Sequence, residues 1–272
     1  MKKYEELTIC DNFMFAKVFS NADIAQDFLQ DILKIDIEKI SVVSEATLQE
    51  DPFHKSVRLD VQAREGDSGN GRSFDIELQM IDTSELPKRA RYYQGMLDLD
   101  ALGKGVNYDE LKEQYILFLC PEDIFKAGKP VYQFQNREET APNILLGDLC
   151  YKNFYIFSKY REVTDEVTRE YMQYFATQKY ESERIKRIHA FVERYRKDPV
   201  AKKAYMTLEQ ELNIRYKKGL AEGLEKGRAE TRGEEKAIIA RNLLKMKMSV
   251  KDISTATGLS EAEVLGLQKE MQ

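Results

Sequence analysis

Asp60 and Glu77 are two acidic residues whose spacing suits metal chemistry, because each lies in a segment that alternates apolar and polar residues. The segments are VRLDVQARE at 57–65 and RSFDIELQM at 72–80, and the intervening GDSGNG is typical of a turn. A hairpin closed about residues 68–69 sets Asp60 directly opposite Glu77. Two carboxylates about 5 Å apart on a sheet repel each other, so a cation, an arginine or a shared proton must offset them.

The same register pairs Arg58 with Gln79 and Gln62 with Asp75, so the six polar side chains share one face of the hairpin. The other face is apolar and comprises Val57, Leu59, Val61, Phe74, Ile76, Leu78 and Met80. Mg²⁺ and Mn²⁺ prefer oxygen ligands, and Mg²⁺ sites typically combine one or two carboxylates with water and phosphate oxygens. The pattern therefore indicates either a divalent-metal site for phosphate chemistry or an ordinary polar face on which Arg58 offsets the acids.

The elements that must position this hairpin are predicted from the periodicity of apolar residues. In chain order they are one or two helices within 11–34 that break near residues 20–21, a strand at 39–48, the hairpin, a helix after residue 84, and strands at 114–120, 130–135 and 153–158. The helix after residue 84 carries the apolar stripe Leu86, Ala90, Tyr93 and Leu97. The order of elements predicts a mixed α/β domain.

Composition limits the other possibilities. Three cysteines without a CxxC pair and two histidines exclude a zinc ribbon, a disulfide framework and a histidine-rich metal site. Any metal must therefore be held by carboxylates. No apolar run reaches the length of about 18 residues that a membrane span needs, and the first residues lack the apolar stretch of a signal peptide. We expect a cytoplasmic protein with no membrane partner.

From about residue 163 the sequence becomes helical in composition and locally basic. Residues 184–232 contain 14 Lys and Arg against 7 Asp and Glu, although the whole chain has a net charge of −5. Such a segment suits either phosphate contacts or a solvated helical face. Gly219, Gly223 and Gly227 lie four residues apart, which indicates either close packing against a partner helix or a flexible connector.

The end of the chain carries the signals of two short helices joined by a turn. Gly258 marks the turn, and Ser260 with Glu263 forms the pattern of a capping box at the start of the second helix. We therefore divide the chain into a domain at 1–160, a helical extension at 161–235 and a small helix-turn-helix-like segment at 236–272.

A set of ordered segments between about residues 8 and 160 is specific enough to identify a family. They are DNFMFAKVF at 11–19, KSVRLDV at 55–61, FDIELQM at 74–80, RARYYQGMLDLDALGKGVNYDELKEQYILFL at 89–119 and VYQFQNRE at 132–139. The set resembles the Rpn family of recombination-promoting nucleases, often called transposases, in the PD-(D/E)XK nuclease superfamily. The resemblance implies a restriction-endonuclease-like αβββαβ core, with a mixed central sheet flanked by helices, and an α-helical C-terminal extension.

The resemblance also implies which residues hold the metal. Asp60 and Glu77 are expected to bind a divalent cation, and the backbone carbonyl of Leu78 is a further expected ligand. Gln79 occupies the position at which the superfamily usually has lysine. Glutamine can orient the attacking water but carries no charge to stabilise the phosphate, so we expect weakened rather than abolished activity.

Four further residues are candidates for contacts with DNA or with the metal. Arg58 shares the polar face of the hairpin, and Glu45 is a candidate third acid. In the helix after residue 84, Arg91 is expected to reach a DNA phosphate and Gln94 to orient water. Tyr93 is expected in the core because it lies on the apolar stripe.

Together these patterns predict a Mg²⁺- or Mn²⁺-dependent DNA endonuclease, a hydrolase of phosphodiester bonds, associated with recombination or mobile elements. DNA is the expected partner, with a homo-oligomer formed through the C-terminal helices as a second. The alternatives are a DNA-binding module that keeps the fold with little turnover and an oligomerising scaffold dominated by its helical tail. The presence of all six polar hairpin residues favours the nuclease over the first alternative.

Overall fold

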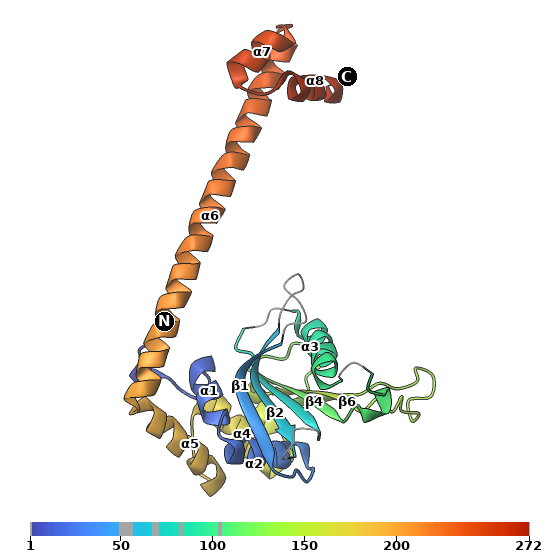
Figure 1. Cartoon of the computed structure of the whole chain (residues 1–272), viewed down its shortest axis with the longest axis vertical. Helices are drawn as coiled ribbons and strands as arrows, with labels where there is room; N and C mark the ends of the chain where they lie inside the picture. The colour runs from blue at the N-terminus through green and yellow to red at the C-terminus, as the bar shows by residue number, and fades with distance from the viewer. Residues whose placement is uncertain (1, 49–56, 67–70, 82–83, 103–104, 272) are drawn as a thin grey trace. The chain divides into compact units, whose positions relative to one another are not determined.

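The computed structural model describes residues 2–48, 57–66, 71–81, 84–102 and 105–271 (Figure 1). The chain begins with two helices, α1 (Asn12–Phe19) and α2 (Ala22–Leu33), with the break where it was predicted. Asn21 caps α2 because its side chain accepts a hydrogen bond from the backbone N–H of Ile24. Short 3₁₀ helices at Tyr4–Glu6, Tyr108–Glu110 and Phe157–Glu162 belong to the connections.

A mixed sheet of six strands follows in the described part of the chain. Its strands are β1 (Ile40–Leu48), β2 (Val57–Glu65), β3 (Ser73–Leu78), β4 (Gln114–Cys120), β5 (Val131–Phe134) and β6 (Cys150–Ile156). They lie in the order β1-β2-β3-β4-β6-β5, with β3, β4 and β6 parallel and the remaining neighbours antiparallel. Parallel neighbours need a crossover connection, which α3 (Leu86–Ala101) provides between β3 and β4. The predicted αβββαβ fold is confirmed, with β5 and β6 added at one edge.

Different helices cover the two faces of the sheet (Figure 1). On one face, Phe74 and Ile76 of β3 lie in a large apolar core with residues of α1 and α2. On the other face, the predicted apolar stripe of α3 is buried against Ile116 and Phe118 of β4. All seven residues of β4 are buried, as expected for a strand covered on both faces.

Two further helices complete the large core. They are α4 (Glu166–Thr177) and α5 (Glu183–Arg196), each of which begins at an acidic or hydroxyl N-cap residue. Ile185, Ile188 and Val192 lie on one side of α5 and are buried in the same core as the residues of α1 and α2. These helices therefore belong to the domain that carries the sheet.

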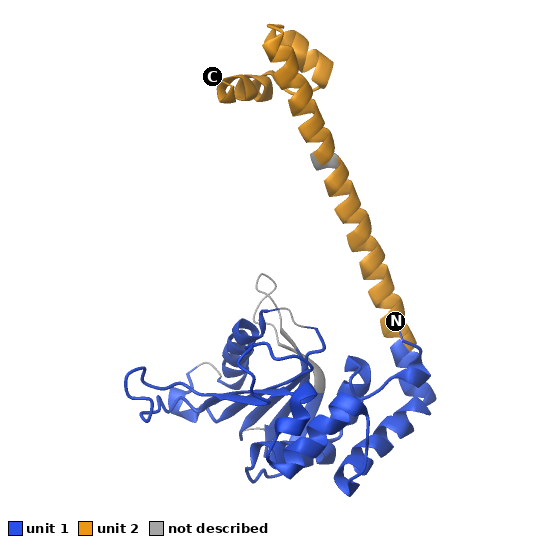
Figure 2. Cartoon of the chain, turned by 180° about the vertical axis from the view of Figure 1, so that it is seen from behind, with its two compact units in different colours: residues 1–205 blue, residues 206–272 orange. Residues whose placement is uncertain are grey.

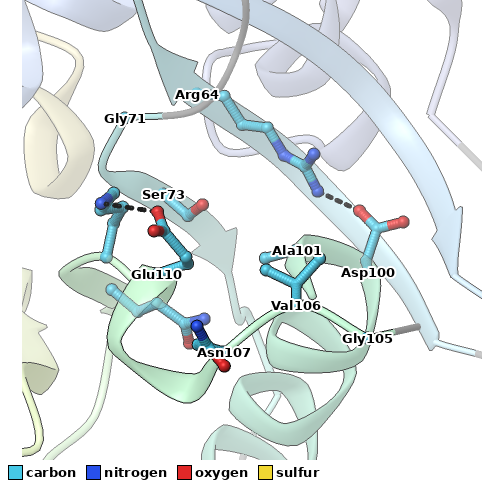
Figure 3. Close-up of a pocket in the computed structure, with 11 residues that line it drawn as sticks. Arg64, Gly71, Ser73, Asp100, Ala101, Gly105, Val106, Asn107 and Glu110 are labelled. Atoms are coloured by element: carbon cyan, nitrogen blue, oxygen red, sulfur yellow. Dashed lines mark hydrogen bonds and ion pairs between the residues drawn. The ribbon is translucent and has the colours of Figure 1, made fainter. Parts of the chain in front are cut away.

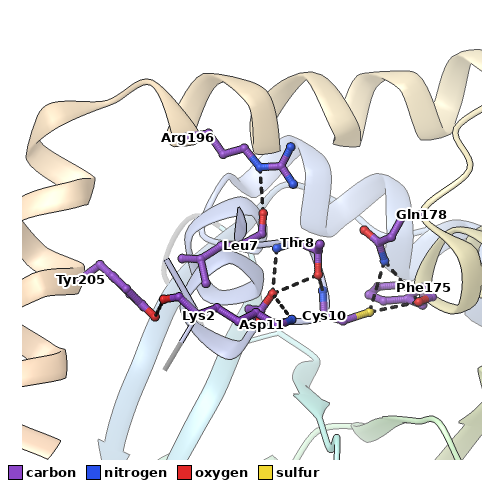
Figure 4. A network of polar contacts seen from close by, with 9 residues as sticks. All are labelled: Lys2, Leu7, Thr8, Cys10, Asp11, Phe175, Gln178, Arg196 and Tyr205. Atoms are coloured by element: carbon purple, nitrogen blue, oxygen red, sulfur yellow. Dashed lines mark hydrogen bonds and ion pairs between the residues drawn. The ribbon is translucent and has the colours of Figure 1, made fainter. Parts of the chain in front are cut away.

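Polar contacts join the same helices to the N-terminal segment (Figure 4). Nε of Arg196 donates to the carbonyl of Leu7 at 2.8 Å, and the hydroxyl of Tyr205 donates to the carbonyl of Lys2 at 2.9 Å. Tyr205 lies at the beginning of α6 (Pro199–Lys245). The first compact unit accordingly covers residues 1–205 and ends well beyond residue 160, where the change in composition placed the boundary.

Residues 206–272 form a second compact unit (Figure 2). It contains the rest of α6 together with α7 (Val250–Thr257) and α8 (Glu261–Glu270). Ala240, Ile253 and Val264, one from each helix, make a small apolar core. Among the described residues, no helix of either unit combines the length and the apolar character that crossing a bilayer requires.

The turn between α7 and α8 has the predicted chemistry. Gly258 ends α7 at a φ of 66°, in the left-handed region that favours glycine. The hydroxyl of Ser260 accepts the backbone N–H of Glu263 at 3.3 Å, and the Glu263 carboxylate accepts the backbone N–H of Ser260 at 2.7 Å. The capping box is confirmed.

Candidate active site

The β2–β3 hairpin has the register that the sequence predicts. Val61 pairs with Ile76, and Gln62 pairs with Asp75. The turn requires glycine at position 71, because a Cβ there would lie 2.7 Å from the carbonyl oxygen of Glu65. Asp75 is aligned with Ile116 of β4, which packs beneath α3. The polar face of the hairpin is therefore the face that α3 covers.

The hydrogen-bond ladder of the hairpin opens at Asp60. The backbone N–H of Leu78 donates to Oδ2 of Asp60 at 3.1 Å, and the backbone N–H of Asp60 donates to Oε1 of Glu77 at 2.9 Å. Each carboxylate thus accepts a backbone donor from the opposite strand. These two bonds hold Asp60 and Glu77 together at the end of the hairpin, which is the juxtaposition that the register predicts.

The opening of the ladder also changes the position of Leu59. Strict alternation predicts Leu59 on the same apolar face as Val61, but Leu59 is buried in the cluster beneath α3 with Leu86 and Ala90. The prediction for Leu59 is wrong, because β2 departs from the regular ladder at the next residue, Asp60.

Two acids of this site are buried almost completely, with exposed fractions of 0% for Asp75 and 3% for Glu77. Burial raises the pKa of Glu77 to about 8, and the charge of Asp60 adds to the increase. Burial also raises the pKa of Asp75 well above its usual range, with the charges of Glu77 and Asp60 as further causes. In the described part of the chain no N–H group donates to either Asp75 oxygen, and the group that shares a hydrogen bond with this carboxyl is the carboxyl of Glu77. Interacting carboxyls buried in this way retain a proton at neutral pH unless a cation compensates them.

Arg89 of α3 also contacts this site, although the sequence interpretation gave it no role. Its Nη2 donates to Oε2 of Glu77 at 3.1 Å, and its Nη1 donates to Oε1 of Gln79 at 2.5 Å. Nε and Nη2 also donate to the hydroxyl of Tyr93, at 3.1 and 2.7 Å. The available signal was the four-residue spacing of Arg89 and Tyr93, which places both on the side of α3 that faces the sheet.

A comparison with models of known families agrees with this geometry. The model described as PD-(D/E)XK nuclease family transposase matches residues 10–216. The chain belongs to this family. The match includes the hairpin, α3 and the helices α4 and α5, and it confirms the resemblance drawn from the sequence motifs. No curated protein and no solved structure matches the chain.

Both ends of the Gln79 amide make hydrogen bonds. Its Oε1 accepts from Arg89, and its Nε2 donates to the backbone carbonyl of Ile81. β3 ends one residue earlier, at Leu78, so Gln79 lies where the strand leaves the sheet. The amide that we expected to orient water therefore contacts Arg89 here.

The other predicted residues lie in different surroundings. Arg91 is exposed on α3. Gln94 is buried, and its Oε1 accepts a hydrogen bond from the ammonium group of Lys152 on β6. Glu45 and Arg58 belong to β1 and β2, and their side chains lie outside the described part of the chain. The structure thus brings Asp60, Glu77 and Gln79 together and engages Gln94 with a more distant strand.

The oxygen donors of Asp60 and Glu77 fit a divalent cation. Asp60 and Glu77 provide two carboxylates, a number that Mg²⁺ commonly uses when water and phosphate oxygens complete its coordination. Burial and the charge of Asp60 raise the pKa of Glu77, and a bound cation would favour the ionised carboxylate that acts as a ligand. Among the described residues no cluster of three or more His, Cys, Asp or Glu side chains is arranged to hold a metal, so the site offers a two-carboxylate set.

A cavity of about 550 Å³ lies near the opposite end of β2 (Figure 3). Its lining includes Arg64, which donates to the carboxylate of Asp100, and Gln114, whose Nε2 donates to Asp98 at 2.7 Å. The lining includes none of the residues of the acid site. The cavity is therefore a separate feature of the domain.

The basic segment at 184–232 is largely neutralised within the first unit. Ion pairs join Arg184 to Asp31 and Glu170, Arg187 to Asp27, and Lys202 to Glu5. Residues 206–232, in the second unit, contain 6 Lys and Arg against 5 Asp and Glu. Of the two interpretations of the basic segment, a solvated helical face is therefore the one that the nearly balanced charges of residues 206–232 favour.

Proposed function

We propose that this chain is a Mg²⁺- or Mn²⁺-dependent DNA endonuclease that acts in recombination or in the movement of mobile elements. The observation that carries the proposal is the pair formed by Asp60 and Glu77, which two strands hold together at the end of a hairpin. Membership of a nuclease family supports phosphodiester hydrolysis as the reaction. DNA is the substrate that this family implies.

Asp60, Glu77 and the backbone carbonyl of Leu78 would hold the cation. Such a cation, when bound, lowers the pKa of a water molecule and stabilises negative charge on the phosphate. The chain itself orients the two carboxylates through the backbone N–H groups of Leu78 and Asp60. The cover of α3 keeps Glu77 away from bulk water, which strengthens every electrostatic interaction at this acid.

A plasmid-nicking assay with Mg²⁺, Mn²⁺ or EDTA tests the proposal. We expect the wild-type protein to nick DNA with either cation and to stop in EDTA. Asp60→Ala should lower the rate at least about a hundredfold, the usual cost of removing one key electrostatic group. Asp100→Ala is the matched control, because Asp100 is an exposed acid that pairs with Arg64 beside the separate cavity. Equal nicking by wild type and Asp60→Ala would remove Asp60 from the reaction.

Self-association through α6 is a second candidate property, and exposed side chains of this helix favour it. Leu212, Tyr216, Leu220 and Leu224 are exposed at four-residue spacing. A Cβ added at Gly223 would meet nothing within 4 Å, so the helix surface there is open to a neighbour. Sedimentation velocity tests this candidate: a dimer or larger species should become monomeric in Leu220→Glu. A wild-type monomer at high concentration would argue against it.

A further inference from the structure

Arg89 is held at the acid site by contacts that use four of its N–H groups, to Glu77, to Gln79 and twice to Tyr93. A guanidinium has five N–H groups, so one Nη1 proton remains for another acceptor. The Arg89 side chain is 27% exposed, whereas that of Glu77 is 3% exposed. Of the two charged side chains in this contact, Arg89 is therefore the one that solvent reaches.

The charges around Arg89 create a problem for any phosphodiester. Asp60, Asp75 and Glu77 are acids, and the phosphate of DNA is itself an anion. A cation bound to the acids offsets part of this repulsion, but a substrate oxygen also needs a donor directed at it. Arginine is suited to that task, because a hydrogen bond from a guanidinium N–H to a phosphate oxygen is assisted by both charges and is stronger than a neutral one, and one such N–H of Arg89 remains.

We propose that Arg89 is the phosphate-binding residue of the reacting centre and that Gln79 holds it in place. This inference rests on the proposed nuclease function and adds a residue to it. The neutral Oε1 of Gln79 is an acceptor for Arg89 at 2.5 Å, whereas a cationic side chain at position 79 would repel the guanidinium. The chain thus carries on α3 the positive charge that position 79 lacks.

The contact between Arg89 and Glu77 leads to a second expectation. Nη2 of Arg89 donates to Oε2 of Glu77, so a divalent cation at Glu77 must share this carboxylate with a positive neighbour. Removing the charge of Arg89 should therefore strengthen Mn²⁺ binding while it weakens cleavage. A purely structural role predicts that both would weaken together.

The test uses the full chain and the variants Arg89→Gln, Arg89→Lys, Gln79→Lys and the double variant Gln79→Lys/Arg89→Gln. Arg89→Gln should nick plasmid at least about a hundredfold more slowly and bind Mn²⁺ more tightly, as measured from the electron paramagnetic resonance of free Mn²⁺. Arg89→Lys should retain part of the activity. The double variant should nick faster than either single variant, because it moves the positive charge from α3 to position 79.

Arg64→Gln is the matched control, since Arg64 lies on the same hairpin and pairs with Asp100 away from the acids. Its nicking rate and Mn²⁺ affinity should equal those of the wild type. An active wild type with an equally active Arg89→Gln would overturn the inference and leave the nuclease function standing. Loss of both Mn²⁺ binding and nicking in Arg89→Gln would mean that Arg89 only maintains the structure of the site, which would also overturn the inference.

A wild-type protein that does not nick at all would count against the proposed function instead. In that case the affinity for a short DNA duplex decides the role of Arg89. Weaker binding of the duplex by Arg89→Gln than by Arg64→Gln would support the inference. Equal binding by the two variants would overturn it.

Discussion

Strand β3 has opposite chemistry on its two faces, although all six of its residues are buried. Phe74 and Ile76 lie in the apolar core with α1 and α2, while Asp75 and Glu77 lie beneath α3. Burying an apolar side chain stabilises a fold by about 1.5–3 kcal/mol, whereas burying an acid is unfavourable unless it is protonated or paired. The comparison teaches that one face of β3 stabilises the domain, whereas the other keeps buried acids at a cost in stability, which is the pattern expected of the reacting groups that we propose.

The largest effect on cleavage should come from replacing Glu77 by a neutral residue. Glu77 lies with Asp75 on the side of β3 beneath α3, which we call the acid face. Glu77→Gln should slow Mg²⁺-dependent cleavage by about a thousandfold, because it removes a negative ligand while keeping the shape of the side chain. The same variant should be at least as stable as the wild type in urea at about pH 8, since it removes a buried charge. Glu122→Gln, in the connection after β4, is the control. If Glu77→Gln were less stable than the wild type and fully active, Glu77 would serve the stability of the fold and not the reaction.

Substitutions on the apolar face of β3, which carries Phe74 and Ile76, should lower stability. Ile76→Ala should lower the free energy of unfolding by about 3 kcal/mol, because it leaves a cavity in the large core. Asp75→Asn, one position earlier and on the acid face, should raise it or leave it unchanged, because it replaces a buried ionisable group by a neutral one of the same shape. Urea denaturation at about pH 7 measures both. If Ile76→Ala and Asp75→Asn lowered the free energy of unfolding equally, both faces of β3 would contribute to stability in the same way.

Stability should also depend on pH through the acid face. The pKa of Glu77 is raised in the folded protein, from 4.5 to about 8, so the folded state binds more protons than the unfolded state between these values. The stabilisation is fully present below about pH 4.5 and is lost as the pH rises through about 8. From about pH 7 to 8.5 the contribution of Glu77 to the free energy of unfolding should fall by about 1.3 kcal/mol, which is less than the full 1.4 kcal/mol for each unit because Glu77 loses its proton within this range.

Glu77→Gln provides the control for this pH dependence. Its free energy of unfolding should fall less over the same range, because only Asp75, whose pKa shifts in the same direction, remains on the acid face. Thermal or urea unfolding at a series of pH values supplies the measurement. Parallel pH profiles for wild type and variant would mean that Glu77 ionises in the folded protein as freely as in the unfolded chain.

A smaller effect is expected from metal binding in the absence of DNA. Mg²⁺ or Mn²⁺ at about ten times its dissociation constant should raise the free energy of unfolding by about 1.4 kcal/mol, which corresponds to a few degrees in Tm. Asp60→Asn should abolish this shift and should itself be slightly more stable without metal, because it relieves the repulsion with Glu77. Differential scanning fluorimetry measures the Tm of the wild type and of Asp60→Asn with and without the cation. An undiminished shift in Asp60→Asn would exclude Asp60 as a ligand.

The smallest effect should follow from removing the second unit. A chain ending after residue 216 keeps the family match and the whole first unit, and it loses a segment with nearly balanced charge. Its affinity for a DNA duplex and the salt dependence of that affinity should change by no more than about twofold. Fluorescence anisotropy at several salt concentrations tests this. A much weaker and less salt-dependent complex would show that the tail contributes the phosphate contacts.

Much of the fold was predictable because local patterns decide it. The alternation in β2 and β3 and the glycine-rich turn between them specify the pairing of Gln62 with Asp75. Capping residues such as Asn21 and Ser260 mark helix starts independently of the rest of the chain. These features depend on neighbours in the sequence, so sequence alone is sufficient for them.

Features that depend on tertiary contacts were not predictable in the same way. Helical periodicity shows that α5 is amphipathic but not that Ile188 lies in the core beneath the sheet, and the first compact unit extends to residue 205. A count of charges along the chain cannot show that Arg187 is paired with Asp27. The role of Arg89 depends on how α3 lies across β3, and the position of Leu59 depends on an opening in the ladder that no local pattern marks.

The crossover helix α3 has a consequence for how this protein can evolve. Asp60, Glu77 and Arg89 come from one stretch of about 30 residues, because α3 follows directly on the strand that carries the second acid. A centre encoded so compactly is inherited as a single piece and is seldom divided by genetic exchange. The second unit lies downstream of this stretch in the chain, so substitutions in residues 206–272 leave all three side chains unchanged.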